Sequence, residues 1–284
     1  MTILRKLFSL AEAEDLPTDR GLVDEGQPAF GFFTDTTLCI GCKACEVACK
    51  QWNQLPADGF RFTGHSYDNT SMLSATTWRH VAFNEQVREP PGDSGPAVSR
   101  WLMLSDVCKH CAQAPCQQSC PTGAILYNEF GDVYVQSDIC NGCGYCVVAC
   151  PFGVLSRSEE DGRAHKCTLC YDRQKGGLTP ACAKACPTES IQFGPLDVLR
   201  QRAWDRLAEL QGRGVHKAAL YGAEATPEYS ALNAFFLITD HPNAYNLPEA
   251  PRRPHQGMLA RYVASVGTGL LLAGIAALCF ARGR

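Results

Sequence analysis

The stretch from Cys140 to Pro151, "CNGCGYCVVACP", carries four cysteines separated by two, two and three residues, and a proline follows the last of them. Thiolates at two-residue spacing can converge on one metal centre, and both zinc ions and iron–sulfur clusters are bound in this way. Zinc sites usually take two well-separated Cys-x2-Cys pairs, whereas this run holds four thiols together. The stretch therefore favours an iron–sulfur cluster and a fold built around it.

Three further stretches repeat the pattern, so that sixteen of the seventeen cysteines fall into four quartets. In chain order they are "CIGCKACEVACK" from Cys39, "CKHCAQAPCQQSCP" from Cys108, the stretch from Cys140, and "CTLCYDRQKGGLTPACAKACP" from Cys167. The second and fourth quartets have longer gaps between their second and third cysteines, but both still end in Cys-x3-Cys-Pro. The first has Lys50 in place of the proline. Four such quartets predict four [4Fe–4S] clusters.

The chain between the quartets predicts how they pair. In bacterial ferredoxins the last cysteine of the run binds the cluster of the neighbouring run, so that two runs form one two-cluster unit. Between the second and third quartets, "AILYN" (124–128) and "DVYVQ" (132–136) are short β-rich runs around a glycine, which predicts the hairpin of one contiguous unit. By elimination, the first and fourth quartets form an outer unit into which the inner unit is inserted. Sequential pairing, first with second and third with fourth, is the alternative, and the intervening residues 50–107 disfavour it.

Exchange of the last cysteine within each unit predicts which thiols share a cluster. We number the four predicted sites one to four: Cys39, Cys42, Cys45 and Cys186; Cys49, Cys167, Cys170 and Cys182; Cys108, Cys111, Cys116 and Cys150; and Cys120, Cys140, Cys143 and Cys146. Every iron then has a cysteine ligand, which leaves no open iron position for a substrate. The sequence also contains no phosphate-binding glycine loop and no convincing nucleophile–base pair. We therefore predict no catalytic residue and a role in conducting electrons.

Composition argues against several other classes of protein. The 284 residues include 26 basic and 29 acidic side chains, a net charge of -3, so we predict no nucleic-acid partner. A disulfide framework is typical of short secreted chains, and the N-terminus lacks the unbroken apolar region of an export signal. A zinc-rich structural or nucleic-acid-binding module remains as the alternative from another class.

The C-terminal region predicts a membrane anchor. Residues 262–281, "YVASVGTGLLLAGIAALCFA", lie between Arg261 and Arg282 and contain no charge. At about 1.5 Å per residue, such a helix spans roughly 30 Å of hydrocarbon. Arginines flank the span on both sides, so the positive-inside rule gives no orientation. The span has no histidine to bind a haem, which places any membrane haem on another subunit.

The remaining segments complete a predicted α+β fold of two nested ferredoxin-like units, each binding two clusters, and a single transmembrane helix. In the insertion between the first and second quartets (residues 50–107), we expect a strand within 76–87 and then a loop at 89–97. The insertion either faces a partner or is a hairpin that only connects the two quartets. Apolar residues at helical spacing predict a helix after Pro195, and "ALNAFFLIT" predicts a buried strand. The predicted domains are an arm (1–34), the first outer half with the insertion (35–107), the inner unit (108–157), the second outer half (158–194), a helical, partner-contacting extension (195–257) and the anchor (258–284).

Two longer stretches and the anchor make the chain resemble a known family. "GFFTDTTLCIGCKACEVACKQWN" (31–53), "LNAFFLITDHPNAYNLP" (232–248) and the C-terminal anchor are similar to the iron–sulfur (β) subunit of membrane-bound respiratory formate dehydrogenase. That family also lacks the proline of the first quartet, as here at Lys50. The quartets alone are shared by a wider group of four-cluster subunits that serve molybdopterin oxidoreductases and some hydrogenases. The equivalent subunit of one of those enzymes is therefore the alternative function.

The resemblance implies a hetero-oligomer at the inner (cytoplasmic) membrane that works in anaerobic respiration. A catalytic α subunit with a molybdenum or tungsten bis-pterin cofactor would oxidise formate. Its electrons would pass singly through this chain to a membrane cytochrome b γ subunit and on to quinone. Site one would lie nearest the α subunit, as in the family. The resemblance also implies that the cluster-bearing part faces the periplasm and is exported already folded with its α partner.

Overall fold

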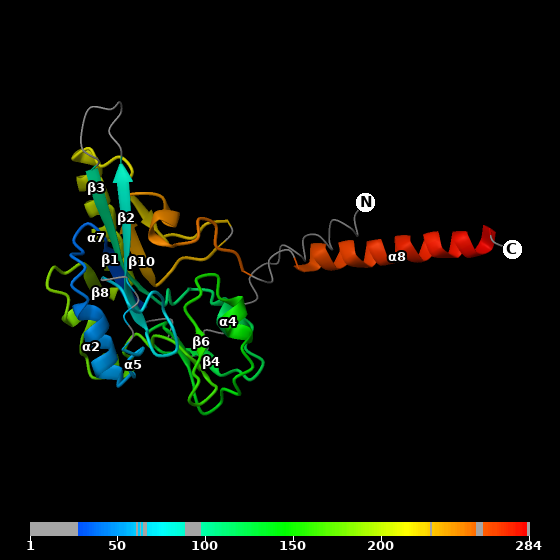
Figure 1. Cartoon of the computed structure of the whole chain (residues 1–284), viewed down its shortest axis with the longest axis horizontal. Helices are drawn as coiled ribbons and strands as arrows, with labels where there is room; N and C mark the ends of the chain where they lie inside the picture. The colour runs from blue at the N-terminus through cyan, green and yellow to red at the C-terminus, as the bar shows by residue number, and fades with distance from the viewer. Residues whose placement is uncertain are drawn as a thin grey trace. The chain divides into compact units, whose positions relative to one another are not determined.

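The computed structural model describes residues 28–282 except 61, 63, 65, 66, 89–97, 228 and 254–257. The predicted loop at 89–97 and most of the predicted N-terminal arm lie outside the described residues. The chain divides into two compact units, and all sixteen quartet cysteines belong to the unit Asp19–Pro251. The other unit contains the C-terminal segment Arg252–Arg284. Figure 1 shows both units.

A four-stranded sheet organises the cysteine-bearing unit, with strand order β8-β1-β10-β9 (Figure 1). The strands are β1 (Phe30–Asp35), β8 (Ile191–Pro195), β9 (Ala219–Tyr221) and β10 (Ala234–Ile238). β1 pairs parallel with β10 and antiparallel with β8, and β9 pairs antiparallel with β10. All five residues of β10 are buried, as predicted from its apolar run. The predicted arm boundary at residue 34 falls inside β1, because the run "FGFFT" is apolar enough to form a buried strand.

Helix α7 (Leu196–Gly212) packs on strands β1 and β8 and confirms the helix predicted after Pro195. Its five apolar positions at helical spacing are all buried: Leu196, Leu199, Ala203, Leu207 and Leu210. Pro195 precedes the first turn and Asp197 lies within it, where a carboxylate is favoured by the helix dipole. The opposite face of α7 is mostly polar, with Val198 and Trp204 as its large exposed apolar residues.

Three antiparallel hairpins extend this core. The first pairs β2 (Arg79–Arg88) with β3 (Val98–Val107), the second pairs β4 (Ile125–Tyr127) with β5 (Val133–Val135), and the third pairs β6 (Ser156–Arg157) with β7 (Ala164–His165). The β4–β5 hairpin confirms the one predicted between the second and third quartets. Leu102 and Leu104 of β3 pack with Phe236, Ile238 and Tyr245, so the insertion contributes to the core as well as connecting two quartets.

Short helices follow the cysteine loops. They are α2 (Ala44–Asn53), α3 (Pro115–Gln118), α4 (Tyr145–Ala149), α5 (Tyr171–Lys175) and α6 (Ala181–Lys184), and a 3-10 turn, η1 (Pro242–Tyr245), lies near the end of the unit. Helix α2 of the first quartet packs against α6 of the fourth, and α3 of the second packs against α4 of the third. The contacts between helices therefore follow the pairing of quartets that the sequence predicts.

The C-terminal unit contains helix α8 (Met258–Arg282). Its segment Tyr262–Ala281 has a mean hydropathy of 2.1, and none of the most apolar part is buried within the protein. Among the described residues, this is the helix that is long and apolar enough to cross a membrane.

Candidate iron–sulfur sites

The four Cys-x2-Cys loops share one backbone feature. The residue just before the second cysteine has a positive φ in every loop: Gly41 (66°), His110 (41°), Gly142 (72°) and Leu169 (54°). Glycine adopts this conformation without strain, whereas histidine and leucine do so at a cost. A Cβ at Gly142 would also lie 2.3 Å from the carbonyl oxygen of Gly162, so glycine is required there for space as well. All four loops therefore share a left-handed residue at this position, although they differ beyond it, since Lys43, Gly144 and Cys170 also have positive φ.

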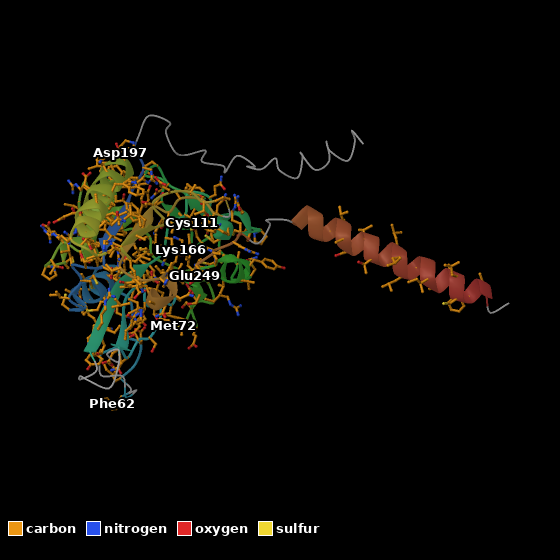
Figure 2. All side chains as sticks on the ribbon, turned by 90° about the horizontal axis from the view of Figure 1, so that it is seen from above. Phe62, Met72, Cys111, Lys166, Asp197 and Glu249 are labelled. Carbon is orange, nitrogen blue, oxygen red and sulfur yellow. The ribbon has the colours of Figure 1, made fainter. Side chains whose placement is uncertain are left out.

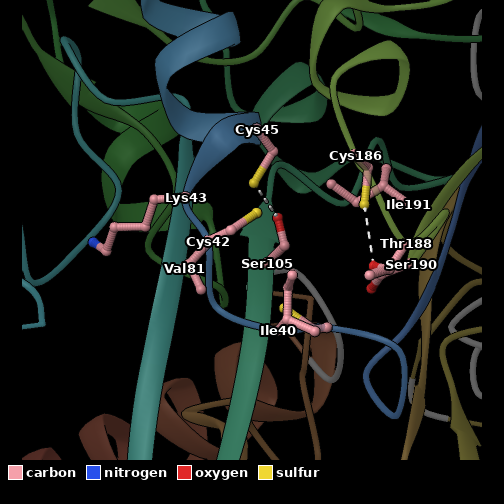
Figure 3. A pocket seen from close by; sticks show the side chains of 11 residues that line it. Ile40, Cys42, Lys43, Cys45, Val81, Ser105, Cys186, Thr188, Ser190 and Ile191 are labelled. Carbon is pink, nitrogen blue, oxygen red and sulfur yellow. Dashed lines mark hydrogen bonds between the residues drawn. The ribbon is translucent and has the colours of Figure 1, made fainter.

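Site one is a cavity of about 290 Å³ lined by the four cysteines predicted to share it. Figure 3 shows Cys42 and Cys45 at the start of α2 and Cys186 on a separate segment across the cavity. The hydroxyl of Ser105, on β3, lies 3.2 Å from the Cys45 sulfur, and that of Thr188 lies 3.8 Å from the Cys186 sulfur. Thiols from two distant quartets thus face one space.

Sites three and four are also cavities, each of about 290 Å³ and each lined by its four predicted cysteines. Cys150 joins the second quartet's Cys108, Cys111 and Cys116 at site three. Cys120 joins the third quartet's Cys140, Cys143 and Cys146 at site four. The helices α3 and α4 end at or just before Cys120 and Cys150, because the proline after each cysteine disfavours continued helix. This ending turns the last cysteine of each quartet toward the other quartet.

The predicted cysteines of site two also lie together. Cys49 is buried on α2, and its sulfur is within electrostatic reach of Cys170 and Cys182. The buried Cys167 is similarly close to Cys49, Cys170 and Cys182. Burial, reinforced by these neighbouring sulfurs, raises the pKa of the Cys49 and Cys167 thiols above the ordinary value. Bringing four thiolates together in this interior therefore requires positive charge among them.

Lys50, the residue that replaces the proline of the first quartet, fastens the insertion to α2. Without a proline, α2 continues to Asn53, four residues beyond Cys49. The Lys50 ammonium donates to the carbonyl oxygens of Pro56 and Thr76, both at 2.9 Å, and pairs with the Asp58 carboxylate at 3.0 Å. Lys50 therefore allows α2 to continue past Cys49, and its contacts hold the insertion (residues 50–107) beside sites one and two.

Buried cations lie among the sulfurs, and these were not among the predicted functional residues. Arg79 is 1% exposed, and its Nη2 donates to the Cys182 sulfur at 3.2 Å. Lys166 is 2% exposed and lies among the sulfurs of Cys108, Cys116 and Cys167. The position of Lys166 directly before Cys167 was the one sequence signal for it. Arg79 lies far from any quartet in the sequence and carried no such signal.

Two other residues missed by the sequence analysis point polar groups at site three. Tyr229 donates its hydroxyl to the Cys111 sulfur at 3.3 Å. His110 lines the cavity and is fully buried, and neither ring nitrogen has a hydrogen-bond partner in the described part of the protein. Burial, with the nearby Lys166 and Arg79 charges, lowers the pKa of His110 well below its usual value, so the ring is neutral. A neutral imidazole with an unpaired N–H suits hydrogen bonding to a cluster sulfur.

The donor sets fit iron–sulfur clusters better than single zinc ions. Among the residues that the structure describes, no three side chains of His, Cys, Asp or Glu are close enough to share one metal ion. A cubane spreads its four thiolate ligands over four irons, so its sulfurs lie farther apart than those around one ion. The thiols instead line cavities, and His110 offers an unpaired N–H group at the site-three cavity in the described part of the chain.

Comparison with known proteins identifies the family. A 4Fe-4S dicluster domain matches residues 38–124, and a second of the same description matches residues 99–196. The formate dehydrogenase iron-sulfur subunit of Haemophilus influenzae is 39% identical over 222 residues, covering 77% of this chain and 68% of that protein. The formate dehydrogenase-O iron-sulfur subunit of Escherichia coli is 41% identical over 221 residues, covering 76% and 70%.

The chain belongs to the family of formate dehydrogenase iron–sulfur subunits. Its relatives extend to a subunit of the anaerobic dimethyl sulfoxide reductase of Escherichia coli, which is 35% identical over 184 residues, covering 63% of this chain and 80% of that protein. As a formate dehydrogenase-type iron–sulfur subunit, the chain transfers electrons through [4Fe–4S] clusters within an oxidoreductase complex. The resemblance to this family is thereby confirmed.

Proposed function

We propose that this chain holds four [4Fe–4S] clusters, one at each numbered site, and links a formate-oxidising catalytic subunit to a membrane cytochrome b subunit and quinone. The observation that carries the proposal is that cysteines of two quartets line one cavity, which supports an exchange of the last cysteine between quartets. Cys186 faces the cavity of Cys39, Cys42 and Cys45, although more than a hundred residues separate it from them. Such an exchange is how two-cluster ferredoxin units are assembled.

The residues of the chain hold the thiolates, bury them and supply hydrogen bonds to their sulfurs. When bound, each [4Fe–4S] cluster accepts and releases one electron at a time. In this proposal, residues 35–107 and 158–194 form the outer unit, 108–157 form the inner unit, and 195–257 form an extension that contacts partners. The catalytic subunit carries the molybdenum or tungsten pterin, so this chain contributes no catalytic residue of its own. The complex is a hetero-oligomer.

Metal analysis and spectroscopy of the purified complex test this proposal. We expect about four irons and four acid-labile sulfides for each of the four sites, beyond those of the catalytic subunit. Addition of formate without air should bleach the brown absorbance and produce the paramagnetic signals of reduced clusters. A chain that carries zinc and no acid-labile sulfide would refute the proposal.

The similarity to a subunit of anaerobic dimethyl sulfoxide reductase supports a second candidate, the electron-transfer subunit of another molybdopterin oxidoreductase or of a hydrogenase. The three functions differ in the reactant that changes the redox state of the clusters. Formate or hydrogen would reduce them, whereas dimethyl sulfoxide would reoxidise clusters that had been reduced chemically. If formate changes the redox state of the clusters and the other two reactants do not, our assignment is supported. If only hydrogen or only dimethyl sulfoxide does so, the chain serves the corresponding enzyme instead.

We further propose that helix α8 anchors the complex as a single transmembrane span, with the cluster-bearing unit on the periplasmic side of the inner membrane. Lysine in place of both Leu271 and Leu272, which are 63% and 61% exposed, should release the chain from washed membranes. The matched change to two alanines should not release it. Protease added to intact spheroplasts should digest the cluster-bearing unit, and digestion only in inverted vesicles would place that unit in the cytoplasm.

A further inference from the structure

Arg79 lies between site one and site two, and each of its two terminal guanidinium nitrogens is directed toward one of these sites. Its Nη2 donates to the sulfur of Cys182, a site-two cysteine, at 3.2 Å. Its Nη1 donates to the carbonyl oxygen of Ser105 at 3.1 Å and lies 3.4 Å from the Ser105 hydroxyl. That hydroxyl is 3.2 Å from the sulfur of Cys45, a site-one cysteine. One guanidinium is thus connected to both sites within the core of the outer unit.

No carboxylate compensates this buried charge in the part of the chain that the structure describes. The guanidinium lies 4.7 Å from the ring centroid of Phe32, and its Nε has no hydrogen-bond partner there. Burial alone lowers the pKa of an arginine, but the sulfurs of Cys182, Cys45 and Cys167 outweigh burial and raise it. A buried cation without a partner is strongly destabilising, so the negative charge that stabilises Arg79 must come from the two sites themselves.

Lys166 occupies the corresponding position between site two and site three. Its ammonium donates to the carbonyl oxygens of Val133 and Cys167, and its charge acts on the sulfurs of Cys108 and Cys116 at site three and of Cys167 at site two. Figure 2 labels Lys166 and Cys111 within the cysteine-bearing unit, while Phe62 lies at its edge. Like Arg79, Lys166 is an almost fully buried cation that faces two sites.

Asp132 is a buried acid whose charge interacts with that of Lys166, although the two form no salt bridge in the described structure. Its carboxyl accepts hydrogen bonds from Asn128 and Gln174, and burial raises its pKa to about 7. Lys109, which is also buried beside site three, differs because it pairs with Asp106. The charge of Lys109 also acts on the sulfurs of Cys111 and Cys150, but unlike Lys166 and Arg79 this lysine has a carboxylate at salt-bridge distance among the described residues.

We propose that Arg79 and Lys166 are positioning residues that set the reduction potentials of the clusters on either side of them. Arg79 acts on sites one and two, and Lys166 acts on sites two and three. Four thiolates make each cluster anionic, and reduction adds one more negative charge, so a nearby buried cation stabilises the reduced form and raises the potential. Site two faces both cations and site four faces neither. The inference rests on the proposed presence of a cluster at each site.

Redox titration of the purified complex, followed by electron paramagnetic resonance, tests the inference. In Arg79→Gln we expect two of the four midpoint potentials of this chain to fall. In Lys166→Gln we expect two to fall, and one of these is shared with Arg79→Gln because site two faces both cations. For each affected cluster we expect the equilibrium constant for reduction to fall about tenfold. This corresponds to a midpoint potential lower by about 59 mV for a one-electron couple.

Arg100→Gln is the matched control. Arg100 lies on the same hairpin, opposite Gln86, which is roughly 23 Å from Arg79 at ~3.3 Å per residue. Its partner is the Asp240 carboxylate, at 3.6 Å, and no quartet cysteine contacts it among the described residues. All four potentials should stay unchanged in this variant. A third variant, Arg79→Lys, keeps the positive charge, so the potentials at sites one and two should fall less than in Arg79→Gln.

The possible outcomes separate the inference from the proposed function. A wild-type complex without cluster signals would overturn the proposed function, and the inference with it. Four intact signals whose potentials do not change in either glutamine variant would overturn the inference alone. If Arg79→Gln fails to assemble, the midpoint potentials of Lys166→Gln and Arg79→Lys test the inference instead. Loss of clusters in all three would give the cations a role in holding the fold and would overturn the inference.

Discussion

Site three and site four are built from the same two quartets, but protein encloses one of them and solvent reaches the other. At site three, Cys108, Cys111 and Cys116 are buried, whereas at site four only Cys146 is buried and Cys143 is exposed. Burial raises the pKa of the Cys116 thiol well above its usual value. At site four burial tends to raise the pKa of Cys120, but hydrogen bonds from Thr122 and nearby backbone amides outweigh it and lower that pKa. Burial raises the pKa of Cys146, the buried thiol of this site, to about 11.

The difference arises from residues outside the quartets. Tyr229, which donates to the Cys111 sulfur, is 118 residues away from it in the sequence, and it comes from the extension after α7. At site four the donors are local or weak: the Thr122 hydroxyl lies 3.5 Å from the Cys120 sulfur, and the Ala164 amide lies 3.5 Å from the Cys140 sulfur. The quartet thus determines which thiols meet, while remote segments determine how each site is enclosed and polarised.

The largest expected difference between the two sites follows replacement of one ligand at each. Cys116→Ser should remove the site-three cluster and also lower the free energy of unfolding, because a buried hydroxyl without a partner costs about 1–3 kcal/mol beyond the lost cluster. Cys143→Ser should remove or alter only the site-four cluster. Iron content and thermal unfolding of the two purified variants measure this. Equal losses of stability would contradict the contrast in burial.

A second expected difference concerns removal of the metal. Ferricyanide and a chelator should strip iron from site four several-fold faster than from site three, because Cys143 is exposed and the site-three sulfurs are shielded by Tyr229 and Phe152. The paramagnetic signals of samples taken over time, assigned with the two serine variants, give the order of loss. Simultaneous loss from both sites would show that enclosure by the protein does not control access.

The smallest expected effect is that of a single hydrogen bond. Tyr229→Phe removes the hydroxyl that donates to Cys111 and should lower the midpoint potential of the site-three cluster by less than about 59 mV, a tenfold change in its equilibrium constant. Thr122→Val at the exposed site four is the matched variant and should shift its cluster less. A larger shift for Thr122→Val would reverse the comparison.

Most of the local structure could be predicted from the sequence, because its signals are strong and short-range. The buried face of α7, the strand β10 and the hairpin of β4 and β5 follow directly from apolar periodicity and turn residues. The cysteine motif, together with the hairpin between the second and third quartets, also predicted which thiols would face each other, and those cysteines line the cavities of sites one, three and four. In these regions local pattern and tertiary packing agree.

The surroundings of the sites could not be predicted in the same way. Arg79 begins an ordinary alternating strand, and nothing in that pattern shows that its guanidinium lies beside Cys182, 103 residues later. The central position of β1 was also missed, because its parallel pairing with β10 joins segments about two hundred residues apart. Such contacts depend on the assembled fold, and a single sequence contains no local signal for them.

The exchange of cysteines between quartets is the central claim, and Cys186→Ser tests it most directly. Electron paramagnetic resonance of the reduced complex should show that this variant loses the same cluster signal as Cys42→Ser, whose thiol faces Cys186 across site one. The signal that disappears in Cys170→Ser, at site two, should remain. If Cys186→Ser instead loses the Cys170→Ser signal and keeps that of Cys42→Ser, each quartet binds its own cluster and the account is wrong.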